Sequence, residues 1–200
     1  MPSTATLSAR RKWWISLEPQ WQLAFQTSIL IHTDTPTDDE LDNIMSLTSF
    51  TCLGASAQYP TVDFELTNLS GLKELSELET LVLTHHKLRD VSGLEGLKYL
   101  KNVFLSNNEI TSLRGIENLK KMEQLNVQNN KIESLLPVKL LTQLKELYVN
   151  FNELNSFEGV TSAHSKCLKM FHCLPCESMS FKDIIFFEQA MGVRCEGKRA

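Results

Sequence analysis

Apolar residues return at a fixed interval through the middle of the chain. Leu78, Leu100, Met122 and Leu144 stand 22 residues apart, and apolar residues follow each of them at the third and fifth positions. The position between those two varies in polarity, as expected of a strand with one buried face. A constant period with one strand per unit predicts a repeat architecture. The strand triplets are Leu81-Val82-Leu83, Val103-Phe104-Leu105, Leu125-Asn126-Val127 and Leu147-Tyr148-Val149.

The second half of each unit has a different pattern. Apolar residues recur there at every third position, as at Val91, Leu94 and Leu97, and this period suits 3₁₀-helical or extended segments better than α-helix. Between the two halves, a polar residue stands three positions beyond the triplet and an apolar residue follows two positions later. These pairs are His86 and Leu88, Asn108 and Ile110, Asn130 and Ile132, and Asn152 and Leu154.

The complete unit, L-x-x-L-x-L-x-x-N-x-L, resembles the leucine-rich repeat, and its length is similar to that of the short internalin-like and phosphatase-regulator-like class. The resemblance covers about residues 47–176. It implies an α/β fold, namely a solenoid with a curved parallel β-sheet on the concave face and an irregular or 3₁₀-helical convex side. It also implies that the asparagine amides are buried and bond to main-chain groups at the turn.

These asparagines are therefore predicted to stabilise the fold rather than to bind a partner. They are Asn108, Asn130 and Asn152. His86 occupies the same position in the first regular unit. Two interpretations stay open for it: a ring nitrogen does the work of the amide, or the side chain turns outward.

Degenerate repeats extend the pattern in both directions, to about six in all. Leu47, Phe50 and Cys52 keep the strand spacing, but nine extra residues within 54–65 lengthen this first unit to 31 residues. At the other end, Phe171 and Cys173 keep the spacing, and the position of the asparagines is taken by Cys176. The family accepts either Asn or Cys there, so Cys176 is predicted to close the structural ladder.

Residues 1–46 are predicted to form a helical cap, because the end of a solenoid exposes an apolar interior that an atypical segment must cover. Residues 1–10 are expected to be frayed. A first helix is expected from Leu17, with Trp13 and Trp14 preceding it as packing residues. A second begins at the capping box of residues 37–40 and ends near Ser46. Its predicted buried residues are Leu41, Ile44 and Met45.

Residues 177–200 are predicted to cap the other end. Ser180 and Asp183 form a second capping box, which opens a helix over 181–191 that Gly192 ends. Three apolar side chains of this helix are expected to seal the repeats: Phe181, Ile184 and Ile185. Residues 194–200 are expected to be a loose basic tail.

Composition narrows the class of protein further. A net charge of -4 argues against binding to nucleic-acid backbones, which favours a basic surface. No apolar run approaches the roughly 20 residues that span a bilayer, and the first residues lack the apolar core of a signal peptide. The five cysteines are odd in number and irregularly spaced, which is typical of reduced thiols. The sequence therefore predicts a cytoplasmic protein, with no membrane partner.

The segment Cys173-Leu174-Pro175-Cys176 is the one candidate for metal or redox chemistry. His164, Cys167 and His172 lie near it in sequence, which would suit zinc. A redox pair of this spacing, however, belongs at the start of a helix, and structural zinc usually needs two ligand pairs. No phosphate-binding loop or hydrolase motif occurs either. We therefore expect core cysteines, no cofactor, no metal and no enzymatic activity.

The outward strand positions are the candidate binding surface. They are uncharged, with isolated aromatic rings, and either form a solvated sheet or bind a partner. The hypothesis carried forward is a monomeric, non-catalytic module that binds a protein or peptide on its concave face. The alternatives are a secreted leucine-rich repeat effector, or a thiol or zinc activity at Cys173 and Cys176. The predicted binding residues are Val82, Phe104, Asn126, Tyr148, His172, His85, Gln128 and Phe151, and Leu174 is also expected to be exposed beside them.

Overall fold

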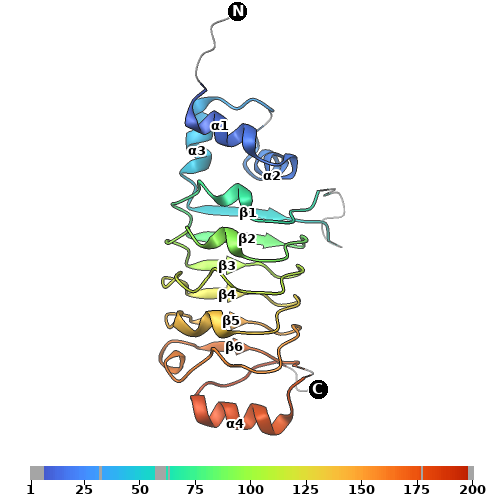
Figure 1. The fold of residues 1–200 in the computed structure, drawn as a ribbon, viewed down its shortest axis with the longest axis vertical. Helices are drawn as coiled ribbons and strands as arrows, with labels where there is room; N and C mark the ends of the chain where they lie inside the picture. The colour runs from blue at the N-terminus through green and yellow to red at the C-terminus, as the bar shows by residue number, and fades with distance from the viewer. Residues whose placement is uncertain (1–6, 32, 57–61, 63, 177, 198–200) are drawn as a thin grey trace, which may run out of the picture.

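A computed structural model describes residues 7–31, 33–56, 62, 64–176 and 178–197 of the chain. Six strands form one parallel sheet in the order in which they occur in the sequence, with helices at both ends (Figure 1). This confirms the predicted fold class. The strands are β1 (Ser49–Leu53), β2 (Thr80–Thr84), β3 (Asn102–Phe104), β4 (Gln124–Asn126), β5 (Glu146–Tyr148) and β6 (Met170–His172).

The register of the sheet follows the period of the sequence. Val82 pairs with Phe104, Phe104 with Asn126, and Asn126 with Tyr148, so equivalent residues of successive units are direct neighbours. In β2, Leu81 and Leu83 are fully buried, whereas Val82 between them is partly exposed. The alternation read from the sequence therefore assigns the inward and outward faces correctly.

The return segments are short and partly 3₁₀-helical, as the period of three predicts. Leu94 donates its main-chain N–H to the Val91 carbonyl at 3.0 Å, and Leu97 donates to the Leu94 carbonyl at the same distance. All three side chains are buried. The 3₁₀ segments are η1 (Ser70–Leu72), η2 (Ser92–Leu94), η3 (Leu136–Leu140) and η4 (His164–Lys166).

The asparagine ladder connects neighbouring repeats through main-chain groups. The Asn130 amide nitrogen donates to the carbonyls of Leu105 and Val127, both at 3.0 Å, and its oxygen accepts from the Ile110 N–H at 2.9 Å. Asn108 and Asn152 make the same three kinds of bond. Each amide thereby satisfies groups that the bend of the chain takes away from the sheet.

His86 takes the ladder role through its ring, which resolves the two interpretations of this residue. Its Nδ1 accepts from the Leu66 N–H at 3.4 Å, and its Nε2 lies 3.2 Å from the Cys52 carbonyl, to which it donates. The ring is buried, and burial lowers the pKa of His86. Only glycine fits at position 54 beside the ring, because a Cβ there would lie 1.7 Å from the His85 carbonyl oxygen and 2.8 Å from His86 Nδ1.

Three helices rather than two precede the sheet: α1 (Ala9–Ser16), α2 (Pro19–Ile29) and α3 (Asp38–Met45). The expectation that residues 1–10 are frayed is wrong for the last two of them. Ser8 caps α1 by accepting from the Arg11 N–H, and Arg10 pairs with Asp42 at 2.6 Å. The two tryptophans therefore belong to a helix instead of preceding one. Residues 1–6 lie outside the described part of the chain.

Aromatic rings join these helices to the first strand. Phe25 of α2 lies 5.0 Å from Phe50 of β1 and 5.7 Å from Trp21, measured between ring centroids. Trp13 packs edge-on against Phe25 at 5.7 Å. The predicted capping box of α3 is present, and Leu41 and Ile44 are fully buried, whereas Met45 is partly exposed.

The other end is closed by α4 (Phe181–Met191), with the predicted capping box and Gly192 in the left-handed conformation. Ile184 is buried as predicted, but the prediction that Phe181 also seals the repeats is wrong. Phe181 is 53% exposed, and Phe187 instead packs against Phe157 and Phe171, at 5.1 and 6.1 Å between ring centroids. Phe181, at the first position of the helix, faces away from the core.

The segment after α4 is not a loose tail up to residue 197. Glu196 donates its N–H to the Phe171 carbonyl at 2.8 Å, and its own carbonyl accepts from the Cys173 N–H at 3.2 Å. Cys195 beside it is buried. The free edge of β6 needs partners for its main-chain groups, and this segment supplies them. Residues 198–200 lie outside the described part, as do 57–61 and 63 of the insertion and residue 177.

Candidate functional site

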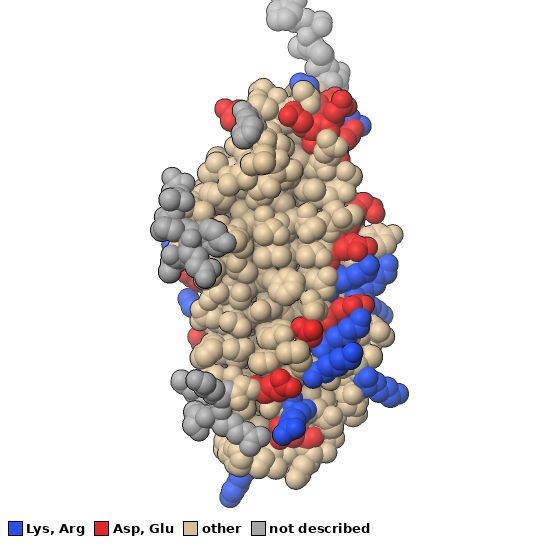
Figure 2. Space-filling model, turned by 180° about the vertical axis from the view of Figure 1, so that it is seen from behind, with Lys and Arg blue, Asp and Glu red and all other residues tan. Residues whose placement is uncertain are grey.

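The outward residues of the six strands form one surface, called here the sheet face, on which Glu146 is the one acidic strand residue. Five predicted binding residues lie on it in a row across the strands, all partly exposed: Val82, Phe104, Asn126, Tyr148 and His172. Figure 2 shows the molecule from behind, where uncharged side chains cover the middle of the surface and charged ones gather along one edge. Five pockets of about 280 to 520 Å³ among the described residues lie away from this row.

Two rings at the C-terminal end of the row are held in fixed positions. Tyr148 stacks on His172 with ring centroids 4.9 Å apart and an interplanar angle of 18°. The Tyr148 hydroxyl donates to the Glu146 carboxylate at 3.1 Å, and His172 Nε2 lies 3.2 Å from the Glu196 carboxylate. Burial raises the pKa of Tyr148, and the hydrogen bond to the nearby Glu146 carboxylate raises it further. The stack is therefore preorganised, so ordering it on contact with a partner loses little entropy.

Polar side chains beside the rings are partly engaged within the protein. Asn126 accepts from the Gln128 N–H at 3.1 Å, and both residues stay partly exposed. The expectation that Leu174 extends this exposed area is wrong, because its side chain is 4% exposed. The C-terminal segment covers it: the Leu174 N–H donates to the Glu196 carbonyl at 3.1 Å, and Gly197 lies against Leu174.

The turns after the strands form a second feature, the turn row, which consists of His85, Asn107, Asn129 and Phe151. All four have left-handed backbones, with φ between 53° and 62°. The side chains of the first three are linked, since Asn129 donates to Asn107 at 2.7 Å and Asn107 lies 3.3 Å from His85 Nε2. Asparagine tolerates this backbone conformation, but a bulky residue rarely adopts it.

Phe151 departs from the turn row in two ways. It is a bulky residue in the left-handed region, and its side chain is 55% exposed. A left-handed backbone costs energy at such a residue, and a ring this exposed returns little of it through packing. The structure brings Phe151 to the rim of the sheet face, next to the strand that carries Tyr148.

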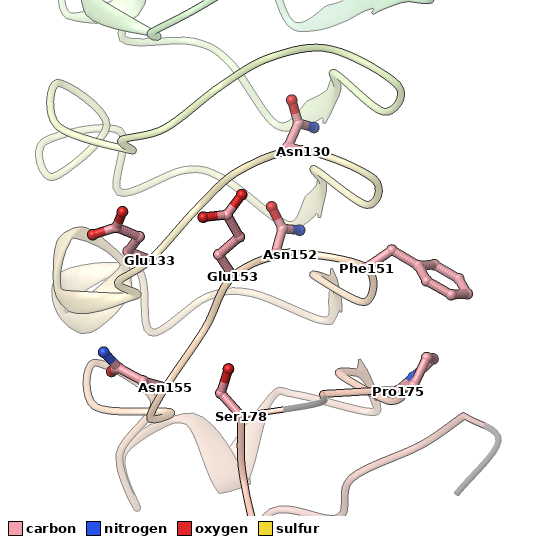
Figure 3. A pocket seen from close by; sticks show the side chains of 8 residues that line it. All are labelled: Asn130, Glu133, Phe151, Asn152, Glu153, Asn155, Pro175 and Ser178. Atoms are coloured by element: carbon pink, nitrogen blue, oxygen red, sulfur yellow. The ribbon is translucent and has the colours of Figure 1, made fainter. Parts of the chain in front are cut away.

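A pocket of about 520 Å³ lies beyond the turns, on the flank of the last repeats. Figure 3 shows the Glu133 and Glu153 carboxylates on its wall, with the Phe151 ring directed away from them. Sequence reasoning missed this pocket because its walls come from turn and return positions of successive repeats, outside the strand positions on which the binding surface was predicted. The other lining residues are Asn130, Asn152, Asn155, Pro175 and Ser178.

Charged residues form two rows with one member in each repeat, 22 residues apart except for the 24 between Lys145 and Lys169. The strand-start row precedes the strands and contains Glu79, Lys101, Glu123, Lys145 and Lys169. The post-turn row follows the ladder positions and contains Glu65, Lys87, Glu109, Lys131 and Glu153. Opposite charges alternate along most of both rows, and neighbouring members pair. The ion pairs are Lys101–Glu79 at 2.9 Å, Lys145–Glu123 at 2.5 Å, Lys87–Glu65 at 2.6 Å and Lys131–Glu109 at 3.6 Å.

The cysteines at the last strand lie in an environment that opposes thiol chemistry. Contact with the Cys195 side chain, together with burial, raises the pKa of Cys173, and burial raises the pKa of Cys176. Cys176 donates to the Leu154 carbonyl at 3.1 Å, whereas the asparagine of the preceding unit accepts from the N–H at the equivalent position, so the two side chains make different bonds there. A reactive thiol needs the opposite shift in pKa. In the described ranges, no three His, Cys, Asp or Glu side chains are grouped so as to hold a metal ion.

Comparisons with known proteins agree with this geometry. Residues 100–140 match the family described as Leucine Rich repeats (2 copies). The internalin inlF of Listeria monocytogenes superposes with a TM-score of 0.54 at 17% identity, covering 94% of this chain and 65% of its own. A leucine-rich repeat protein of Leptospira interrogans gives 0.54 at 21% identity, covering 70% of this chain and 40% of its own. The chain therefore contains leucine-rich repeats and has the leucine-rich repeat fold.

Two further comparisons add no functional information. Internalin C2 of Listeria monocytogenes gives a TM-score of 0.47 at 16% identity, covering 90% of this chain and 93% of its own. No curated protein matches the sequence. Among the described residues, no helix is both long and apolar enough to cross a membrane.

Proposed function

We propose that this protein is a non-catalytic interaction module that binds a protein or peptide segment on its sheet face, centred between Phe104 and Tyr148. The observation that carries the proposal is a row of partly exposed residues without Lys, Arg, Asp or Glu, which crosses the neighbouring strands β2 to β6 and ends in the fixed Tyr148–His172 stack. Small ligands usually bind in concave sites, whereas flat surfaces with aromatic anchors suit macromolecules. Interaction modules are also what the repeat family suggests.

The geometry of the row fits a contact centre. Phe104 and Tyr148 lie two strands apart, which corresponds to about 10 Å at the usual strand spacing. Asn126 lies between them, and Gln124 and Gln128 flank it with amide groups. Aromatic anchors surrounded by polar groups are common at the energetic centre of interfaces. A partner segment that buries both rings can use these amides to satisfy its own main chain.

A photo-crosslinking experiment tests the proposal without knowledge of the partner. A benzophenone side chain is placed at Gln128 on the sheet face, and in a matched variant at Leu140, which is exposed on a return segment. The partner captured from native lysate through Gln128 is then purified, and its affinity is measured for the Phe104→Ala/Tyr148→Ala variant. We expect a loss of about 1–2 kcal/mol of binding for each ring.

A second double variant, Leu136→Ala/Leu140→Ala, removes exposed apolar groups elsewhere and is expected to bind normally. Circular dichroism must show that both variants are folded. Equal affinity of the captured partner for the wild type and the sheet-face variant would overturn the proposal. The next candidate binding surfaces would then be the insertion within 54–65 and the convex side.

We also propose the cytoplasm as the location of the protein. All five cysteines are free thiols. Unpaired buried cysteines suit a reducing compartment. Comparison of cell lysate with culture supernatant tests this, and recovery from the supernatant would favour the alternative of a secreted effector.

A further inference from the structure

The outward row of the sheet face has a regular spacing that a ligand can match. Strands of one sheet lie about 4.8 Å apart, so positions two strands apart are separated by about 10 Å. Phe104 on β3, Tyr148 on β5 and Glu196 on the segment paired with β6 each stand two strands from the next. The row therefore offers two aromatic rings and one carboxylate at equal intervals.

Glu196 belongs to the same face as the rings. It pairs with His172 in parallel register, and its carboxylate lies 3.2 Å from His172 Nε2, so its side chain is on the outward side of the sheet. The strands contribute no Lys or Arg to this face, and Glu146 is their one carboxylate on it. Lys145 and Lys169 precede β5 and β6 and are not part of the face. The C-terminal end of the face therefore complements a cationic group.

Three side-chain amides with free donors stand around the midpoint between the rings. Asn126 lies between Phe104 and Tyr148 in the row. Gln124 and Gln128 stand two residues before and two residues after it in the chain. All three are partly exposed, and within the described ranges their side-chain nitrogens have no hydrogen-bond partner in the protein. They can therefore donate to the carbonyls of a bound chain without first breaking an internal bond.

The ring spacing and the free donors together select the conformation of the ligand. A polyproline II helix repeats every three residues with a rise of about 3.1 Å each, so residues three apart lie about 9.3 Å apart on one side. Its main chain makes no internal hydrogen bonds, so its carbonyls can accept from the amides. An extended strand repeats at about 6.6 Å on one face, which does not match the rings. An α-helix has residues about 10.5 Å apart at every seventh position, but its carbonyls are bonded internally.

Resting on the proposed function, we propose that the partner segment is proline-rich and crosses the strands as a polyproline II helix with the pattern P-x-x-P-x-x-R, or the same pattern in reverse. One proline contacts Phe104, the next contacts Tyr148, and the arginine contacts Glu196. The amides around Asn126 bind carbonyls of the residues between the two prolines. Rings held in place and a ligand helix formed in advance both reduce the entropy lost on binding.

The test uses two libraries of heptapeptides displayed on phage and selected on the whole chain. The first library fixes two prolines and an arginine at intervals of three residues, in both orders. The second has the same fixed residues at intervals of two, as in x-P-x-P-x-R-x, which matches an extended strand instead. We expect binding peptides from the first library and none from the second.

A charge-removing substitution then tests the position of the arginine. Glu196→Gln keeps the shape of the side chain and the main-chain bonds to β6. It should weaken the selected peptides about three- to tenfold at low salt, with a smaller difference as salt rises. Glu133→Gln, the same change at an exposed residue on the flank pocket, is the matched control and should leave their affinity unchanged.

A second pair of variants tests the amides. Gln124→Met removes a donor at nearly constant size and should weaken the selected peptides about two- to tenfold. Gln143→Met makes the same change at an exposed return position and should bind them normally.

The outcomes separate this inference from the proposed function. Equal enrichment of the two libraries, no binding peptide from either, or peptides indifferent to Glu196→Gln would each overturn the proline-rich segment. The sheet-face function then still stands if the partner captured from lysate loses affinity for Phe104→Ala/Tyr148→Ala. If the captured partner binds that variant as tightly as wild type, the proposed function fails, and the inference fails with it.

Discussion

The two ends of the solenoid cover the same kind of apolar interior in different ways. At the N-terminal end, helices α1–α3 bring buried rings onto β1, with Phe25 in contact with Phe50. At the C-terminal end, α4 contributes Phe187, and the segment around Glu196 also continues the main-chain hydrogen bonds of β6. One end is sealed mainly by side chains, and the other partly by extension of the sheet.

The ladder also differs between the two ends. Asparagine occupies its middle positions, whereas His86 begins it and Cys176 ends it. The histidine ring is larger than an amide, and a Cβ at Gly54 would lie only 2.8 Å from its Nδ1. The Cys176 thiol donates one hydrogen bond, to the Leu154 carbonyl, whereas each asparagine amide nitrogen donates to at least two carbonyls. The repeats therefore tolerate different chemistry where one neighbour is missing or atypical, and they use the amide where both neighbours are regular.

Removal of residues 1–46 should have the largest effect, if the N-terminal helices act as the proposed cap. Phe50, Cys52 and the first buried leucines would then face water. We expect an aggregated or unfolded product, which size-exclusion chromatography and thermal unfolding would reveal. The control is a chain that starts at residue 7 and keeps α1. A soluble, cooperatively folding product without residues 1–46 would show that the helices are a separate domain.

Substitution of one aromatic ring at each end should show how much each cap contributes to the free energy of unfolding. Phe25→Ala removes a fully buried ring and should lower the free energy of unfolding by about 3–5 kcal/mol. Phe187→Ala removes a partly exposed ring, so a loss of about 2 kcal/mol is expected. Denaturant unfolding checks both values. Losses of similar size would mean that α4 carries as much of the stability as α2.

Within the ladder, Asn130→Ala should lower the free energy of unfolding by about 1–3 kcal/mol, because it leaves buried main-chain groups without partners. Gln128→Ala, on the partly exposed surface, should change it by no more than about 0.5 kcal/mol. Chemical denaturation of the two variants provides the measurement. If the two losses were equal, the division into ladder and surface would be wrong.

His86→Asn should give the smallest effect at neutral pH and sharpen the comparison of ladder residues through its pH dependence. Burial lowers the pKa of His86 in the folded state. Below the ordinary histidine pKa near 6.5, the unfolded chain therefore binds a proton that the folded chain does not, and stability falls as pH falls. The variant should lack this contribution. Unfolding curves from pH 7.5 to 5 that are parallel for the variant and wild type would contradict it.

The local period of the sequence determined most of the repeat region. It located the six strands, their inward residues, the ladder and both capping boxes, because burial on one side of a strand or turn is written into neighbouring residues. The same pattern placed the row from Val82 to His172 on the outer surface. That this row binds a partner is the proposal made above.

Contacts between distant segments were decided only by the tertiary structure. Whether Phe181 or Phe187 faces the core depends on the rotation of α4 against the last repeat, which the helical period of α4 does not specify. The pairing of Glu196 with β6 covers Leu174, and the flank pocket beside Phe151 is assembled from several repeats. A repeating sequence specifies what each unit buries against its neighbours. The path of the chain beyond the last unit depends on which main-chain groups are left there without partners.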